Sequence, residues 1–325
     1  MTARRYNSLR SGLVDFGFKA MSATARVLGK AAIQVRRASV IQNTEYGRAE
    51  NGRESRTKRL DIYFPPKHPG TPAKYPVVIH FHGGGFRIFS KESHALVAAT
   101  LAKRGHLVFN VDYRLAPRYP YPAALEDAVD AYRWVIAHAQ EYGGDLSRLS
   151  VAGESAGANL ALALSLGAFG LGANASARAL ESLPVKPRKA VLACGYLQVS
   201  NVERFLDDAR VPTWVYERMR IIRKSYLPPS ISAESTDWDL ADPLVVLERV
   251  AESGARLPEN FPEIFIPAGA ADPVISDSLR LDAALRKLAH PVSLKQYAGE
   301  HHGFHLFSWR KRARECLRDI SDFLK

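Results

Sequence analysis

The chain is poor in cysteine and has no long apolar run. Cys194 and Cys316 are its only cysteines, so neither a disulfide framework nor a zinc site is indicated. No stretch of about 18 uninterrupted apolar residues occurs, which argues against a membrane-spanning helix. The N-terminus also lacks the continuous apolar segment of a secretory signal. These absences favour a cytoplasmic protein.

Acidic residues are scarce at the N-terminus. Residues 1–40 contain eight Lys or Arg and one acid, Asp15, and the whole chain carries a net charge of +12. No recognisable nucleic-acid-reading module accompanies this charge, so we expect no nucleic-acid partner. Three interpretations of the basic N-terminus remain: peripheral contact with an anionic membrane, an organelle transit segment, or part of a helical cap. The sequence leaves the oligomeric state open, with a homodimer as one option.

Short apolar runs alternate along the chain with helical segments. Hydrophobic residues make up 46% of the sequence, which suits a large buried core. Continuous apolar strands indicate burial on both faces, hence a mostly parallel sheet between helices. The expected strands are Arg59–Phe64, Pro76–Phe81, His106–Val111, Leu149–Ala152, Lys189–Cys194, Glu263–Pro267 and Val292–Tyr297. The expected helices are Ser93–Lys103, Ala124–Glu141, Ala156–Ala168, Asp277–Leu288 and Ser308–Phe323.

Two segments fall outside this alternation. Residues 1–48 look helical, and residues 196–245 are rich in aromatic and basic side chains. Because insertions at the carboxyl edge of a parallel sheet lie over its ligand crevice, we expect both segments to form a helical cap. Residues 49–195 and 246–325 then form the α/β core. The Gly/Ala/Ser-rich stretch 167–182 is expected to be a surface loop.

Residues 153–157 read Gly-Glu-Ser-Ala-Gly between an apolar run and an alanine-rich helical stretch. A sharp turn from strand to helix exposes a serine hydroxyl, and small flanking residues let the backbone pack closely there. The following helix directs its unpaired N–H groups toward the same place. Ser155 is therefore a candidate nucleophile.

A glycine loop, His82-Gly83-Gly84-Gly85-Phe86, follows an expected buried strand. Glycines permit backbone conformations in which N–H groups face a ligand. The loop therefore predicts an oxyanion hole, which stabilises charge on a tetrahedral intermediate. The candidate donors are the N–H groups of Gly84 and Gly85, together with that of Ala156.

A nucleophilic serine needs a base and an orienting acid. In folds that carry the serine on such a strand-to-helix turn, the acid and then the histidine follow it in the chain. Asp272 and His302 each come after a predicted strand, at the same edge of the sheet. The rival acids are Asp277 and Asp242. Asp277 lies at an expected helix start, and we interpret it as a helix N-cap. The rival bases are His301 and His305, and position alone does not choose among them. His80 and His82 have the spacing of a metal pair but are better interpreted as structural.

The motifs together resemble the hormone-sensitive-lipase-like branch of the α/β-hydrolases. They are, in chain order, His-Gly-Gly-Gly-Phe at 82–86, Asp-Tyr-Arg-Leu-Ala-Pro at 112–117 with Pro-Ala-Ala at 122–124, Gly-x-Ser-Ala-Gly at 153–157, Asp-Pro at 272–273 and His-Gly-Phe at 302–304. The resemblance covers roughly residues 60–325. It implies an α/β-hydrolase fold with a helical cap and a triad of Ser155, Asp272 and His302, the base preceding Gly-Phe.

The resemblance implies a serine carboxylesterase for small-molecule esters of short to medium acyl chains, working without cofactor or metal. An N-acyl or amide deacetylase on the same scaffold, and a non-enzymatic ligand-binding receptor, are the alternatives. Two residues depart from the family pattern: Glu154 stands where Asp is commoner, and Arg118 stands where Glu is usual. We interpret Glu154 as a structural hydrogen-bond anchor beneath the turn.

Overall fold

The protein is built around one eight-stranded sheet. The computed structural model describes Thr24, Val27 and residues 39–51, 54–66, 74–206, 208–228 and 238–325. The strand order is β1-β2-β4-β3-β5-β6-β7-β8, antiparallel in the β1–β2 and β2–β4 pairs and parallel in the others. The strands are β1 (Ser39–Asn51), β2 (Glu54–Phe64), β3 (Tyr75–Phe81), β4 (Leu107–Val111), β5 (Gly144–Glu154), β6 (Lys189–Ala193), β7 (Glu263–Gly269) and β8 (Val292–Tyr297). The predicted mostly parallel sheet is confirmed.

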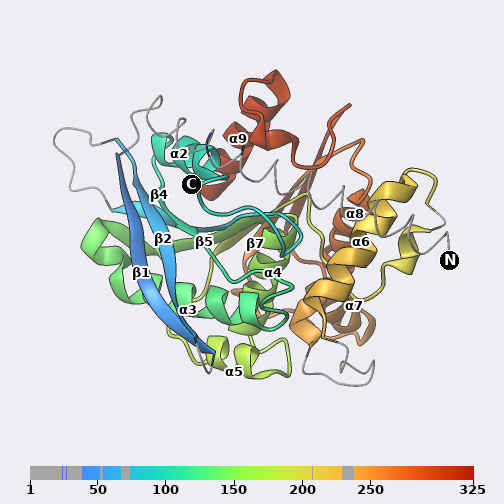
Figure 1. The fold of residues 1–325 in the computed structure, drawn as a ribbon, viewed down its shortest axis with the longest axis horizontal. Coiled ribbons are helices and arrows are strands. Elements are labelled where there is room, and N and C mark those ends of the chain that lie inside the picture. Colours follow the sequence, from blue (N-terminus) through green and yellow to red (C-terminus); the bar gives the residue numbers. More distant parts are fainter. Residues whose placement is uncertain are drawn as a thin grey trace.

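Helices cover both faces of this sheet (Figure 1). One buried cluster joins α2 and α9 to side chains such as Val78, Val108 and Phe265. The other joins α3, α4 and α8 to the strand neighbours Val77, Ile79 and Ile264, which point the opposite way. The helices are α2 (Ala95–Lys103), α3 (Ala123–His138), α4 (Ala156–Ala168), α5 (Ala175–Glu181), α6 (Thr213–Tyr226), α7 (Pro243–Glu252), α8 (Ile275–Lys287) and α9 (Lys311–Leu324).

Two expectations about local structure are wrong. Residues 39–48, expected to be helical, belong to β1, which is paired along its length with β2. The remainder of the predicted N-terminal cap lies outside the described residues, apart from Thr24 and Val27. The expected loop over 167–182 contains α5, whose N-cap Asn174 accepts a hydrogen bond from the Ala177 N–H at 2.9 Å.

The inserted segment after β6 is largely helical. It contains two short 3₁₀ turns, Glu203–Phe205 and Asp239–Ala241, around α6, and it leads into α7. In Figure 1, α6 runs beside the edge of the core rather than within its layers. Within the described ranges, no helix is both long enough and apolar enough to cross a membrane.

The assignment of residues 39–48 to a strand predicts a large effect at Tyr46. This side chain is buried, packs in the core and donates a hydrogen bond to the Asp112 carbonyl. We expect Tyr46→Ala to lower the free energy of unfolding by about 3 kcal/mol or more, as measured by denaturant titration. Ile41→Ala on the same strand, where the side chain is 45% exposed, should cost less than about 1 kcal/mol. Equal, small effects at both positions would contradict the assignment.

Candidate active site

Ser155 occupies a strained turn between β5 and α4. Its φ is 50° and its ψ is −114°, a conformation that side chains rarely adopt. Close packing holds the turn, because a Cβ on Gly157 would lie 2.1 Å from the Phe81 carbonyl oxygen and one on Gly153 would lie 2.3 Å from Gly157 itself. Only glycine therefore fits at these two positions of the motif, because a side chain there would clash with the backbone. Ser155 lies at the N-terminus of α4, as predicted.

The glycine loop lies beside this turn. Gly84 and Gly85 have φ values of 112° and 59°. No described residue accepts a hydrogen bond from the N–H of Gly84, Gly85 or Ala156. Unpaired backbone N–H groups are rare in folded proteins. These are the three N–H groups that the sequence predicts as oxyanion donors.

His302 and Asp272 form a direct pair. The His302 Nδ1 lies 2.9 Å from Asp272 Oδ2, and because a carboxylate only accepts, Nδ1 carries the proton. The other oxygen of Asp272, which is fully buried, accepts from the Val274 N–H at 2.9 Å. Burial lowers the pKa of His302, but the charge and hydrogen bond of Asp272 outweigh it, so the pKa is raised above its ordinary value.

The rival residues have other partners. Asp277 accepts from the N–H groups of Leu197 and Gln198 and pairs with Arg204. It is not an N-cap, since α8 begins two residues earlier, so that interpretation is wrong.

Asp242 likewise binds backbone N–H groups, those of Val199 and Ser200. His301 is exposed, and its Nδ1 contacts the Ala271 carbonyl. His305 is buried, with Nε2 2.8 Å from Glu154 Oε2.

The two histidines with the spacing of a metal pair have structural partners, as predicted. His80 Nδ1 contacts Asn110 Oδ1 at 3.0 Å, and His82 Nδ1 contacts the Gly83 carbonyl at 2.8 Å. Burial lowers the pKa of His82 to about 3 and that of His80 to about 4, so both rings are neutral. His82 thus anchors the glycine loop.

A pocket of about 280 Å³ brings these elements together. Ser155, His302, Gly84 and Gly85 all line it. Helix α6 forms part of its wall, through Trp214, Val215, Arg218, Met219 and Ile222. These wall residues were not predicted individually. Their recurrence at helical spacing within the inserted segment is the sequence signal that could have identified them.

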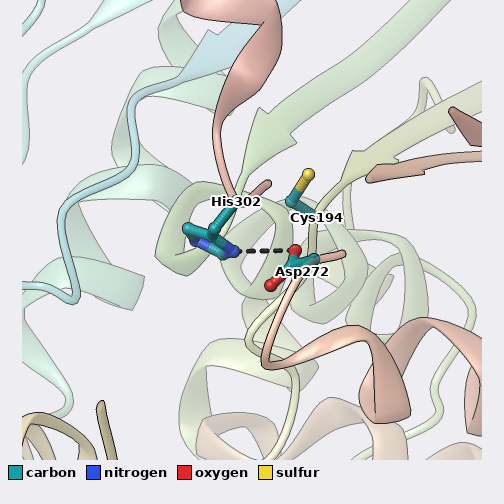
Figure 2. A group of neighbouring side chains, drawn as sticks. All are labelled: Cys194, Asp272 and His302. Carbon is teal, nitrogen blue, oxygen red and sulfur yellow. Dashed lines mark hydrogen bonds and ion pairs between the residues drawn. The ribbon is translucent and has the colours of Figure 1, made fainter. Parts of the chain in front are cut away.

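Cys194 is the other unpredicted neighbour of the site. Its Sγ, an Asp272 oxygen and a His302 nitrogen all lie within 4.8 Å of one another, and Figure 2 shows the thiol beside the His302–Asp272 pair. A metal ligand must be a thiolate, whereas burial and the nearby Asp272 charge raise the pKa of this thiol well above its usual value. The three side chains are therefore better described as an acid–histidine pair that packs against a neutral thiol than as a metal centre.

Known proteins are similar to this chain in sequence and in fold. A family model described as "alpha/beta hydrolase fold" matches residues 78–306. Esterase LipI of Mycobacterium tuberculosis is 46% identical over 112 residues, which are 34% of this chain and 35% of that protein. The hormone-sensitive lipase of Mus musculus is 36% identical over 133 residues, 41% of this chain and 17% of that protein. The chain thus matches about a third or less of the length of these two relatives.

A solved structure extends the likeness of the fold to the whole chain. The hyperthermophilic esterase from the archaeon Pyrobaculum calidifontis superposes with a TM-score of 0.74 at 24% identity, covering 100% of this chain and 98% of that one.

The contact between His302 and Asp272 should be visible in the pKa of the His302 ring, which NMR can measure. The His302 ring should gain its proton at a pH above the ordinary histidine value of about 6.5. In Asp272→Asn the charge and hydrogen bond that raise the pKa most are lost, so the ring should titrate at a lower pH than in the wild-type protein. Ring resonances followed from pH 4 to 9 in both proteins test this, and identical titration curves would contradict the pairing.

Proposed function

This chain belongs to the alpha/beta-hydrolase fold family, in its hormone-sensitive-lipase-like branch, and we propose that it is a serine carboxylesterase. The observation that carries the proposal is one pocket lined by Ser155, His302 and the glycine loop, with Nδ1 of His302 bonded to a buried Asp272. Geometry of this kind suits acyl transfer through a serine nucleophile. The names of the relatives point to the same chemistry.

In the proposed reaction, the Ser155 hydroxyl attacks the ester carbonyl while Nε2 of His302 takes its proton. Asp272 keeps the proton on Nδ1, so that Nε2 is free to accept, and stabilises the imidazolium that forms. The N–H groups of Gly84, Gly85 and Ala156 stabilise the oxyanion. His302 then protonates the leaving alcohol, and water cleaves the acyl-enzyme by the same steps in reverse.

The size and lining of the pocket support the proposal that the substrates carry short to medium acyl chains. Its volume of about 280 Å³ is at the small end of ligand pockets, and side chains such as Val215, Met219 and Ile222 make its α6 wall largely apolar. Burial of each CH₂ of an acyl chain is worth about 0.8 kcal/mol, until the chain no longer fits. Activity should therefore rise with the first few carbons and fall for long chains.

The proposal is tested with p-nitrophenyl esters from acetate to palmitate and with the matching p-nitroanilides. We expect the wild-type protein to hydrolyse short- and medium-chain esters fastest, because these fit the pocket. Ser155→Ala should lose about 10⁴-fold or more in kcat, while circular dichroism shows the same fold.

The other outcomes identify the alternatives. Undiminished hydrolysis by Ser155→Ala would rule out the assigned nucleophile. Faster turnover of the anilides than of the esters would identify an amide deacetylase. Binding of the esters without turnover by the wild-type protein would identify a receptor. Membrane contact through residues 1–40 and formation of a homodimer remain predictions from the sequence.

A further inference from the structure

A buried carboxylate lies directly before the nucleophile and contacts two histidines. Glu154 is 5% exposed. Its Oε1 lies 3.0 Å from Nε2 of His94, and its Oε2 lies 2.8 Å from Nε2 of His305. Both rings are buried as well, with 1% and 3% of their side chains exposed. The proposed reaction uses none of these three groups.

Each partner of Glu154 belongs to a different part of the site. His94 precedes α2, and its Nε2 accepts a hydrogen bond from the Gly83 N–H of the glycine loop at 3.3 Å. That loop touches the carboxylate, since a Cβ on Gly83 would lie 2.4 Å from Glu154 Oε1. His305 lies in the 3₁₀ turn Phe304–Leu306, directly after the segment that carries His302. One carboxylate therefore connects the serine turn, the glycine loop and the histidine loop.

Both nitrogens of the His94 ring have fixed neighbours. The Ser93 hydroxyl donates its one proton to the Ser90 carbonyl at 2.6 Å, so at the 2.9 Å contact with His94 the ring Nδ1 is the donor. On the other side, Nε2 accepts a hydrogen bond from the Gly83 N–H at 3.3 Å and lies 3.0 Å from Glu154 Oε1. The ring is thus fixed between the segment before α2, the glycine loop and the carboxylate.

Glu154 keeps its negative charge in this arrangement. Burial raises the pKa of its carboxyl group, but the charge of His94 and the contacts with both imidazoles outweigh that effect and hold the pKa well below its usual value. A buried carboxylate holds its partners strongly, because separating them would leave its charge without compensation. The length of the Glu side chain matters here, since one carboxylate has to reach two rings.

We propose that Glu154 is a positioning residue that, through His94 and His305, holds the glycine loop and the His302 loop in register with Ser155. This inference rests on the proposed esterase function. Its consequence is a loss in the chemical step rather than in substrate binding, because the groups that move are those that meet in the transition state.

The test compares Glu154→Gln, Glu154→Asp and the wild-type protein on p-nitrophenyl butyrate, with sites counted by a phosphonate titrant. We expect Glu154→Gln to lower kcat per titrated site about 10–100-fold and to change KM less than about threefold. Glu154→Asp keeps the charge but has a shorter reach, so it should recover part of kcat. Glu252→Gln, at the exposed C-terminal end of α7, is the matched control and should change neither value.

A double-mutant cycle separates positioning from a general loss of stability. His305→Gln should cost several-fold in kcat in the wild-type background and little in the Glu154→Gln background, because the contact is already lost there. Equal costs in both backgrounds would overturn the proposal. So would an unchanged kcat per titrated site in Glu154→Gln, or a loss confined to KM.

A measurement without turnover keeps this proposal separate from the esterase proposal. The NMR resonances of the His302 ring should shift or broaden in Glu154→Gln and stay unchanged in Glu252→Gln. If the wild-type protein hydrolyses no ester, the esterase proposal fails while this result still decides the positioning role. Unaltered His302 resonances in Glu154→Gln would overturn that role.

Discussion

The candidate site depends on the tight turn between β5 and α4. Ser155 holds a φ of 50°, which costs about 1–3 kcal/mol in isolation. The turn persists because Gly157 packs against the Phe81 carbonyl at the end of β3 and because α4 is buried along its whole length. The same contact brings the start of the glycine loop, which follows Phe81, beside the serine. Strain at one residue is thus offset by packing of the helix that follows it.

Two buried carboxylates organise the imidazoles around that turn, in different ways. Asp272 faces the single ring of His302 and raises its pKa above the ordinary histidine value. Glu154 faces His94 and His305, away from the proposed proton transfer. Both acids lie at or just beyond the carboxyl ends of parallel strands, the edge at which ligand sites form in such sheets. The sheet therefore brings the acids to one place although they are far apart in sequence.

The sequence predicts the parts of this site that are local motifs. The serine turn, the glycine loop and Asp272 follow from short patterns next to strands, and the family they imply is confirmed. His302 is distinguished from His301 and His305 only by the family resemblance. Contacts between distant segments do not follow from such patterns, so the partners of Glu154 were missed. The strand β1 was missed because an edge strand has one neighbour and tolerates many polar side chains. The wall residues of α6 recur at helical spacing, but that spacing does not say what the helix face packs against.

If Ser155 is a nucleophile activated by its surroundings, it should react covalently with an organophosphate. The protein is treated with diethyl p-nitrophenyl phosphate, digested and analysed by mass spectrometry, with the Ser155→Ala variant in parallel. We expect stoichiometric diethylphosphorylation of Ser155, release of one equivalent of p-nitrophenol, and no labelling in the variant. An unlabelled Ser155, or equal labelling of other serines in both proteins, would contradict this expectation.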